Sequence, residues 1–320
     1  MNFEYLNIFV TGGCGFIPSN FINIYFEKYK NIHIYNVDKM DYCSNENNIF
    51  EYIRNNNKYT FIKGNICDID LIYNIFVKYN IDLVVHFAAD THVSISFEKP
   101  IQFITDNIIG TTSILEAAKK YNKLKKFIYI STDEVYGDIY DFDAVESCLP
   151  HPTNPYSVTK ISAEYMSIVY MKSFNIPVVI TRSNNVFGPN QYPDKVIPKF
   201  IKQLKNNDKI TIEGSGYVIR NFLHTEDLVN ALDHIIKYGV IGEIYNIGSE
   251  IGCSVLELAT KIIKILKKDE KYDKWIIKIN DRPYNDKHYL LNYDKLKKLG
   301  WKIKHTNFDE ELKNLIDNYY

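Results

Sequence analysis

The sequence contains few cysteines, no block of charge of one sign and no long apolar run. Its five cysteines form no CxxC pair, which argues against a zinc site or a disulfide framework and favours a reducing, cytoplasmic setting. The 38 basic and 39 acidic residues nearly cancel, so the electrostatic footprint of a nucleic-acid binder is missing. No apolar run approaches the roughly 20 residues that span a bilayer, and the N-terminus lacks the basic and apolar parts of a signal peptide. We therefore expect a globular protein without metal, membrane or nucleic-acid partners.

Over residues 1–180, short β-branched runs alternate with longer amphipathic stretches. Runs such as "IHIYNVD" and "IDLVVHFAA" are typical of buried strands, whereas "SNFINIYFEKY" is typical of a helix. This alternation predicts an α/β fold, a Rossmann-type doubly wound parallel sheet with helices on both faces. Beyond about residue 181 the pattern changes, which predicts a smaller C-terminal substrate-binding α/β domain over 181–320. A segment near 217–240 is expected to return to the first domain.

The stretch "VTGGCGFIPSN" places Gly12 and Gly15 where the first strand turns into a helix. Glycines there let the backbone approach a pyrophosphate, and the helix N-terminus offers free N–H groups to it. The second strand ends in Asp38, whose carboxylate can accept from ribose hydroxyls and repel a 2′-phosphate, so NAD is favoured over NADP. Lys39 weakens this preference slightly. Pro18 replaces the third glycine, at a place where the first turn of a helix tolerates proline.

Tyr156 and Lys160 lie four residues apart in "NPYSVTKISAEYM", hence on one face of a predicted helix. By itself such a pair is usually a solvated helix face. Beside the glycine loop and Asp38, however, it predicts a phenolate base. The ammonium group and a positive nicotinamide ring would lower the tyrosine pKa from its reference value of about 10, so that the phenolate could take a proton from a sugar hydroxyl.

With "TGGCGFI", "HFAA" and "YSVTK" in this order, the chain resembles the extended short-chain dehydrogenase/reductase superfamily. Within it, "STDEVYG", "TNPYSVTK", "NNVFGPNQYPDKVIPKF", "IRNFLHTEDL", "EIYNIGS" and "DRPYNDKHY" are similar to motifs of the nucleoside-diphosphate-glucose 4,6-dehydratases, over nearly the whole chain. The resemblance implies NAD as cofactor, and a homodimer formed through two helices per subunit, one of them bearing Tyr156. It also implies that further residues contact the cofactor, namely Phe16, Ile17, Asn65, Ile66, Ala88 and Ala89.

The resemblance assigns roles to "STDEVYG", which follows the predicted strand "KKFIYI". Thr132 would position O4 of the sugar beside Tyr156, and Asp133 and Glu134 would remove water across C5 and C6 after C4 has been oxidised. By the family's pattern Glu134 is the base and Asp133 the acid, an assignment that the sequence alone leaves open. The expected activity converts UDP-glucose or dTDP-glucose to the 4-keto-6-deoxy-glucose nucleotide, on the way to a deoxysugar such as rhamnose.

The substrate's diphosphate needs cations and amide donors. The resemblance places these candidates in matched motifs: Asn185, Lys195, Arg220, Asn246 and Arg282. The stretch "DKMDYCSN" at 38–45 is most similar to eukaryotic members, including plant ones that use UDP-glucose, and so favours UDP. His86 and His92 are interpreted as packing or cofactor-pocket residues, because no acid or cysteine cluster completes a metal site around them.

Two other kinds of function stay open on the sequence. A nucleotide-sugar 4-epimerase or decarboxylase could use the same scaffold, although the acid pair at 133–134 disfavours both. A non-catalytic NAD-binding regulator is disfavoured because Tyr156 and Lys160 are both present. The mass of the product discriminates between them: loss of one water marks the dehydratase, unchanged mass the epimerase, and no turnover the regulator.

Overall fold

The computed structural model describes residues 6–139, 143–286 and 290–320, and its centre is a seven-stranded sheet. The strands lie in the order β10, β6, β5, β4, β1, β2, β3, and all neighbours are parallel. This order reverses beside β1, as in a doubly wound dinucleotide-binding sheet, so the predicted Rossmann-type fold is confirmed. The bounds are β1 Leu6–Thr11, β2 Ile32–Asp38, β3 Tyr59–Lys63, β4 Leu83–His86, β5 Lys126–Thr132, β6 Val178–Ser183 and β10 Ile244–Ile247.

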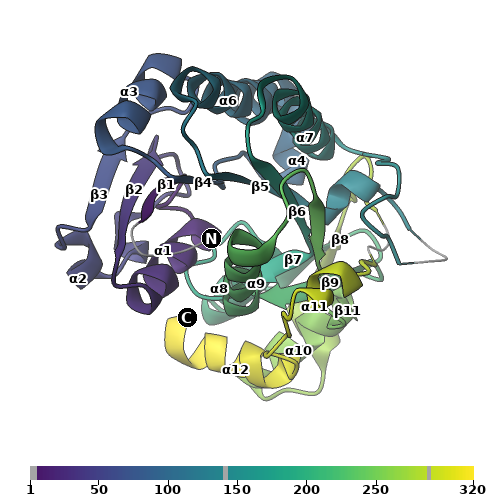
Figure 1. Cartoon of the computed structure of the whole chain (residues 1–320). Coiled ribbons are helices and arrows are strands. Elements are labelled where there is room, and N and C mark those ends of the chain that lie inside the picture. Colours follow the sequence, from purple (N-terminus) through teal and green to yellow (C-terminus); the bar gives the residue numbers. More distant parts are fainter. Residues whose placement is uncertain (1–5, 140–142, 287–289) are drawn as a thin grey trace.

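Helices cover both faces of this sheet, because its central strands are apolar on both sides. All residues of β5 are buried, for example. Figure 1 shows α1 (Phe16–Lys28) and α9 (Thr225–Tyr238) below the sheet and α3, α6 and α7 above it. The other helices in this half of the chain are α2 Glu51–Arg54, α3 Ile69–Tyr79, α4 Val93–Glu98, α5 Pro100–Phe103, α6 Gly110–Tyr121 and α7 Pro155–Phe174, with a π-helical turn at Ile104–Ile109.

A smaller body of strands and helices lies beside the large sheet and has its own apolar core. One three-stranded sheet has the order β11, β9, β7, and β8 pairs with β12 in a second small sheet. Helices α8, α10 and α12 contribute side chains to its core. The bounds are β7 Asn185–Phe187, α8 Val196–Lys205, β8 Ile210–Glu213, β9 Ile219–His224, β11 Gly252–Ser254, α10 Val255–Lys267, β12 Ile276–Ile279, α11 Asp294–Lys298 and α12 Phe308–Tyr319.

The chain returns to the large sheet through residues 225–247. Helix α9 packs against α1, and β10 pairs with β6 at the edge of the sheet. The segment expected to return, near 217–240, therefore begins with a strand of the small sheet, since β9 pairs with β7 and β11. The boundary near residue 180 stays a prediction. No helix within the described ranges is long and apolar enough to cross a membrane.

The parallel sheet brings the candidate site residues to one edge. The glycine loop follows β1, Asp38 ends β2, and Thr132 ends β5. The carboxyl ends of parallel strands meet at the same edge, where ligands bind in open α/β sheets. The topology therefore gathers motifs that are far apart in the sequence.

A buried carboxylate joins α1, which follows the glycine loop, to α9. Asp233 accepts hydrogen bonds from the hydroxyls of Tyr25 and Tyr29 and from the ammonium groups of Lys28 and Lys237. Burial alone would raise the pKa of Asp233, but these four donors hold it below its ordinary value. The charged form of Asp233 is thus the form that stabilises the contact between the two helices.

We predict that Asp233→Ala lowers the free energy of unfolding by about 1–3 kcal/mol, because the buried Tyr25 hydroxyl loses its acceptor. The difference in unfolding free energy between wild type and variant should be full at neutral pH. It should shrink as the pH falls through the depressed pKa of Asp233, because the wild-type carboxylate then becomes protonated. Urea unfolding at several pH values measures both. Lys28→Gln is the control, since the half-exposed Lys28 should contribute less than about 1 kcal/mol.

Candidate active site

A cavity opens at the carboxyl edge of the large sheet. All twelve residues predicted to contact the cofactor line it, and so do Thr132 and Glu134 of the acid motif. The cofactor set consists of Gly12, Gly15, Phe16, Ile17, Asp38, Lys39, Asn65, Ile66, Ala88, Ala89, Tyr156 and Lys160. One continuous cavity therefore connects the glycine loop to the residues expected to do the chemistry.

The glycine loop has no room for side chains. Gly12 has a φ of +67°, and a Cβ there would lie 3.0 Å from the backbone of Ala88. A Cβ at Gly13 would lie 2.0 Å from the side chain of Asn36, whose oxygen accepts from the Gly13 N–H at 2.9 Å. Helix α1 begins directly after Gly15, and Pro18 lies in its first turn, where an N–H has no intrahelical partner. This cradle fits a pyrophosphate.

Asp38 is buried at the end of β2 with its carboxylate fixed by three donors. Oδ1 accepts from the Met40 N–H and the Ser44 hydroxyl, and Oδ2 accepts from the Cys14 N–H. A carboxylate offers about four lone-pair sites, so one is left for a ribose hydroxyl. Lys39 forms ion pairs with Asp41 and Asp106, and these acids take up its charge. The preference for NAD therefore stands without the weakening that Lys39 was expected to cause.

Asn65 was expected to contact the cofactor. Its side-chain oxygen already accepts from the N–H of Cys67 at 2.9 Å, which fixes the amide where it lines the cavity. A second lone pair on the same oxygen can still accept from a ligand.

Asp133 begins a 3₁₀ turn directly after β5 and is 1% exposed. Its Oδ2 accepts from the side-chain amide of Asn184 at 2.8 Å, and its Oδ1 lies 3.2 Å from the hydroxyl oxygen of Thr132. The Asn184 oxygen in turn accepts from the Ser249 N–H at 2.9 Å, so the amide can present only its NH₂ to Asp133. Thr132 and Glu134 line the cavity, whereas Asp133 does not.

Glu134 has a different set of partners. Its carboxylate accepts from the side-chain amide of Asn154 at 3.0 Å, and the Asn154 oxygen accepts from the Ser157 N–H as the N-cap of α7. Arg220 and Arg282 both donate to Asn285, and the charge of each favours the ionised form of Glu134. The two arginines therefore lie beside the acid pair.

Burial and mutual repulsion separate the two acids. Burial and the charge on Glu134 together raise the pKa of Asp133 to about 7, against the hydrogen bonds from Asn184 and Thr132 and the charge of Arg220. Burial also raises the pKa of Glu134 above its ordinary value, although Arg220, Asn154 and Arg282 partly oppose this. The environment therefore favours Asp133 as the proton donor and Glu134 as the proton acceptor.

The expectation that Lys160 lowers the pKa of Tyr156 is not met by the described side chains. Burial and the charge of Glu134 raise the Tyr156 pKa, and a hydrogen bond with Thr132 only partly opposes them. The Lys160 ammonium instead donates to the Ile130 carbonyl at 2.7 Å, and burial lowers its own pKa to about 7. Tyr156 is therefore held as a phenol next to Thr132, and its ionisation requires a further positive charge.

The predicted substrate residues fall into three groups. Asn185 and Lys195 line the cavity, and the arginine pair lies beside Glu134. Asn246 is fully buried, accepts from the Tyr136 hydroxyl, and donates to the carbonyls of Ala144 and Asn292. Its side-chain hydrogen-bonding groups are engaged within the protein. We therefore assign Asn246 to the fold and not to substrate contact.

Sequence reasoning missed the two asparagines that hold the acids. Asn154 could have been found, because an Asn two residues before Tyr156 is an N-cap signal for the helix that bears the base. Asn184 adjoins the predicted Asn185, but its contact with Asp133 crosses from β6 to β5 and leaves no local signal. Asn36, which closes under the glycine loop, was missed for the same reason.

Comparison with known proteins assigns this site to a family. A sequence model of the family described as GDP-mannose 4,6 dehydratase matches residues 9–315. The chain belongs to this family. The dTDP-D-glucose 4,6-dehydratase of Dictyostelium discoideum is 45% identical over 337 residues, which cover 92% of this chain and 77% of that protein.

Two further proteins that are similar to this chain agree with the assignment. A trifunctional UDP-glucose 4,6-dehydratase, 3,5-epimerase and reductase of Arabidopsis thaliana is 40% identical over 98% of this chain, which spans 47% of its length. The dTDP-glucose 4,6-dehydratase of Bacillus anthracis str. Ames, solved in complex with NAD, has 34% identity and a TM-score of 0.89 over 98% of this chain and 96% of that one. The protein is thus an NAD-dependent hydro-lyase of the extended short-chain dehydrogenase/reductase superfamily, as predicted. Solved UDP-sugar 4-epimerases share the fold, so the fold alone does not distinguish the two reactions.

We predict that the alkaline limb of the dehydratase's pH–rate profile reflects deprotonation of Asp133, with the rate of water loss falling above a pH of about 7. Asn184→Ala removes a donor to the charged carboxylate, so the Asp133 pKa should rise and the limb should move up by about one pH unit. Single-turnover rates measured across pH test this.

Asn190→Ala is the matched control, because the Asn190 side chain donates to the Asn48 carbonyl and does not contact the acid pair. Its limb should stay at the wild-type position. An unmoved limb in a folded Asn184→Ala protein would show that Asn184 does not tune the acid.

Proposed function

We propose that the dehydratase converts dTDP-glucose or UDP-glucose to the corresponding 4-keto-6-deoxy-glucose nucleotide. The observation that carries this proposal is the unequal environment of the two neighbouring acids: burial raises the pKa of Asp133 to about 7, whereas Arg220, Asn154 and Arg282 favour the ionised form of Glu134. Elimination of water from a ketone needs one group that takes a proton and one that gives it. The pair directly follows Thr132, and Glu134 lines the same cavity as Tyr156.

In the first stage Thr132 and Tyr156 hold the O4 hydroxyl of the sugar, and Tyr156 accepts its proton. When bound, NAD takes the hydride from C4 and later returns it to C6, and its positive ring supplies the charge that lowers the Tyr156 pKa. Lys160, anchored on the Ile130 carbonyl, keeps the cavity wall beside Tyr156 in place. The ketone formed at C4 makes the C5 proton acidic.

In the second stage Glu134 takes the C5 proton while Asp133, which is hydrogen-bonded to Thr132, gives its proton to the C6 hydroxyl. The C6–O bond breaks, water leaves, and a C5–C6 double bond forms. Glu134 then returns its proton to C5 when C6 is reduced. Each acid ends in the protonation state in which it began, provided that Tyr156 hands its proton back to restore Asp133.

The nucleotide end of the substrate is proposed to contact Asn185, Lys195 and the arginine pair. The stretch at 38–45, which favoured UDP on sequence grounds, contacts both ends of the cavity: Ser44 donates to Asp38 at the cofactor end, and the Tyr42 hydroxyl donates to Asp194, next to Lys195. The preference for UDP stays a prediction. Both nucleotides belong in the assay.

An epimerase or decarboxylase is the alternative on this scaffold. Neither reaction needs a buried carboxylic acid as proton donor, whereas burial raises the pKa of Asp133 to about 7 beside Glu134. The geometry therefore favours elimination. We also propose a cytoplasmic location, because the five cysteines are all free thiols.

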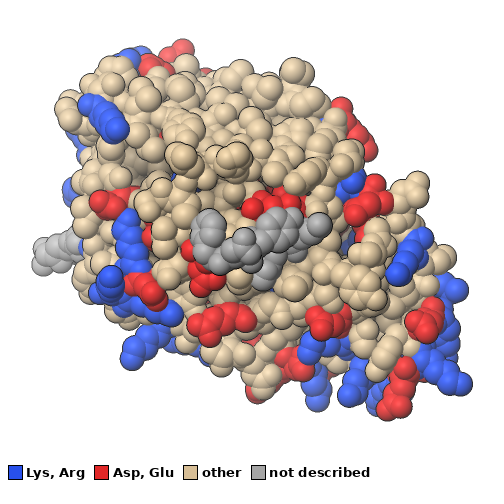
Figure 2. Space-filling model, turned by 90° about the vertical axis from the view of Figure 1, so that its right-hand side faces the viewer, with Lys and Arg blue, Asp and Glu red and all other residues tan. Residues whose placement is uncertain are grey.

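We further propose that the dehydratase is a homodimer. On α7, exposed apolar side chains recur on one face: Val158 is 45%, Tyr165 52% and Val169 51% exposed. The π-helical turn beside α7 exposes Ile104 and Ile109 as well. Figure 2 shows few charges on the upper part of the face toward which α7 lies in Figure 1. A contiguous apolar surface of this kind marks a protein–protein contact.

Incubation with dTDP-glucose and UDP-glucose in D₂O, without added NAD, should give a product that has lost one water and gained deuterium at C5. The Glu134→Gln variant should retain NAD and still oxidise C4, yet should stop water loss, because the amide cannot take the C5 proton. Mass spectrometry and NADH absorbance measure the two steps separately. Epimerised substrate of unchanged mass would contradict the proposal.

The double variant Tyr165→Glu/Val169→Glu should be monomeric, because it places like charges in an apolar contact. Light scattering after gel filtration measures the mass. Val77→Glu is the control, since Val77 is 48% exposed on α3, on another part of the surface. A wild-type mass of one chain would overturn the dimer.

A further inference from the structure

Three potential metal ligands meet outside the cavity. His224 ends β9, Glu226 lies in the first turn of α9, and His305 lies in the segment that leads to α12. One ligand atom from each lies within 4.8 Å of the other two, and all three residues are half-buried. None of them lines the cavity of the active site.

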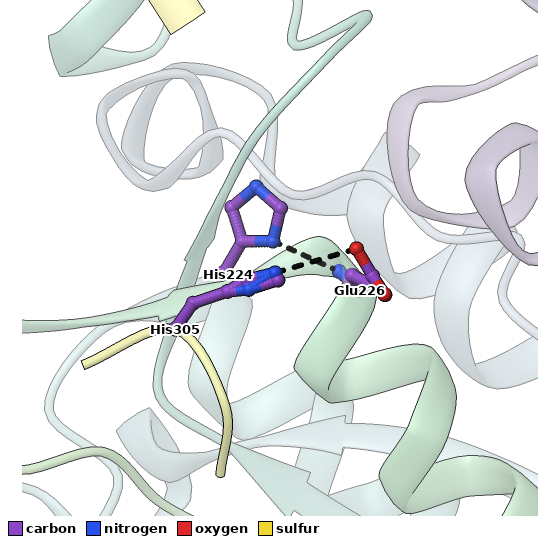
Figure 3. Close-up of side chains that lie close together, drawn as sticks. All are labelled: His224, Glu226 and His305. Atoms are coloured by element: carbon purple, nitrogen blue, oxygen red, sulfur yellow. Dashed lines mark hydrogen bonds and ion pairs between the residues drawn. The ribbon is translucent and has the colours of Figure 1, made fainter. Parts of the chain in front are cut away.

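The ligand atoms of the three residues lie close together. The rings of His224 and His305 stack with centroids 4.1 Å apart, and Figure 3 shows a nitrogen of each directed toward Glu226. His305 Nε2 lies 3.3 Å from the Glu226 carboxylate. His224 Nδ1 accepts from the Glu226 N–H at 3.3 Å, so this nitrogen carries an unshared pair and not a proton.

The second ring nitrogen of His305, Nδ1, lies near a carboxylate but does not yet hydrogen-bond to it. His305 Nδ1 is buried and makes no hydrogen bond within the described residues, and it lies 3.9 Å from Asp227 Oδ2. The Asp227 carboxylate is fixed by the backbone N–H groups of Lys304 and His305 at 2.9 and 3.0 Å. Metal-binding histidines usually donate their other ring N–H to a carboxylate, and Asp227 is the carboxylate that lies near enough to take this role after a small movement of the ring.

We propose that His224, Glu226 and His305 bind a divalent transition metal ion of the zinc class, with Asp227 as the outer partner of His305. Two imidazoles and one carboxylate form a donor set that zinc accepts, with one position left for water. The ion would tie the junction of β9 and α9 to the segment before α12. It would replace the Glu226 N–H as the partner of His224 Nδ1.

The Glu226 side chain is 47% exposed and can rotate to close its distance to about 2.0–2.2 Å from an ion.

The sequence did not predict this site, because its three ligands do not lie close together in the chain. His224 and Glu226 are close in the chain, but His305 follows much later and reaches them only through the packing of the C-terminal segment against α9. Trp301 fixes that packing: its indole N–H donates to the Asp227 carbonyl.

The test is zinc binding to the whole purified chain after treatment with a chelator. Wild-type protein should bind one zinc ion and unfold at a higher temperature when the ion is present. Glu226→Gln and His305→Gln should each weaken zinc binding by more than about tenfold. Loss of an outer partner of a ligand already costs about tenfold, and loss of a ligand should cost more. Cobalt(II) should give visible absorption bands without the thiolate charge-transfer band that the cysteines would produce.

His234→Gln is the matched control, because His234 is a half-buried histidine on α9 that contacts the Asn230 carbonyl instead of the cluster. It should bind zinc like the wild type. Circular dichroism without metal shows whether each variant is folded. The proposal is overturned if the wild type binds no zinc, or if folded Glu226→Gln and His305→Gln proteins bind it as tightly as the wild type does.

Discussion

Two carboxyl groups buried side by side are the constraint around which this active site is arranged. Asp133 and Glu134 cannot both ionise cheaply next to each other in a low-dielectric site. Asn184 and Asn154 each give one of them an amide donor, and each asparagine is oriented by a backbone N–H on its oxygen. The pair therefore has fixed partners, and the arginines favour the ionised form of Glu134.

The sheet topology holds these groups in register with the oxidising residues. Tyr156, Lys160 and Glu164 recur every four residues on α7, and Glu164 forms a fully buried ion pair with Arg182 of β6 at 2.6 Å. That pair fixes the helix carrying the base against the strand that leads to Asn184. Loss of one partner would leave a buried charge, so the ion pair contributes position more than net stability. The same scaffold serves epimerases, and the acids after β5 add elimination to it.

Local chemistry made much of the site predictable from the sequence. Gly12, Asp38 and Tyr156 carry their signals within one strand–helix unit, so the fold, the cofactor cavity and its residues followed from short motifs. The rest depends on contacts across the fold. Three contacts arise from packing between distant segments: the hydrogen bond from Asn184 to Asp133, the hydrogen bonds from both arginines to Asn285, and those that bury Asn246. The raised pKa of Tyr156 is a burial effect, which the spacing of Tyr156 and Lys160 cannot reveal.

The central claim is that Asp133 acts as the acid beside Glu134 because burial raises the Asp133 pKa to about 7. Carbon-13 NMR of protein labelled at aspartate carboxyl carbons reads this directly, with Asp133→Asn used to identify the signal. We predict that the Asp133 carboxyl titrates at a pH of about 7. Titration near the ordinary aspartate value of about 3.9 would contradict the account, because both acids would then be ionised at neutral pH.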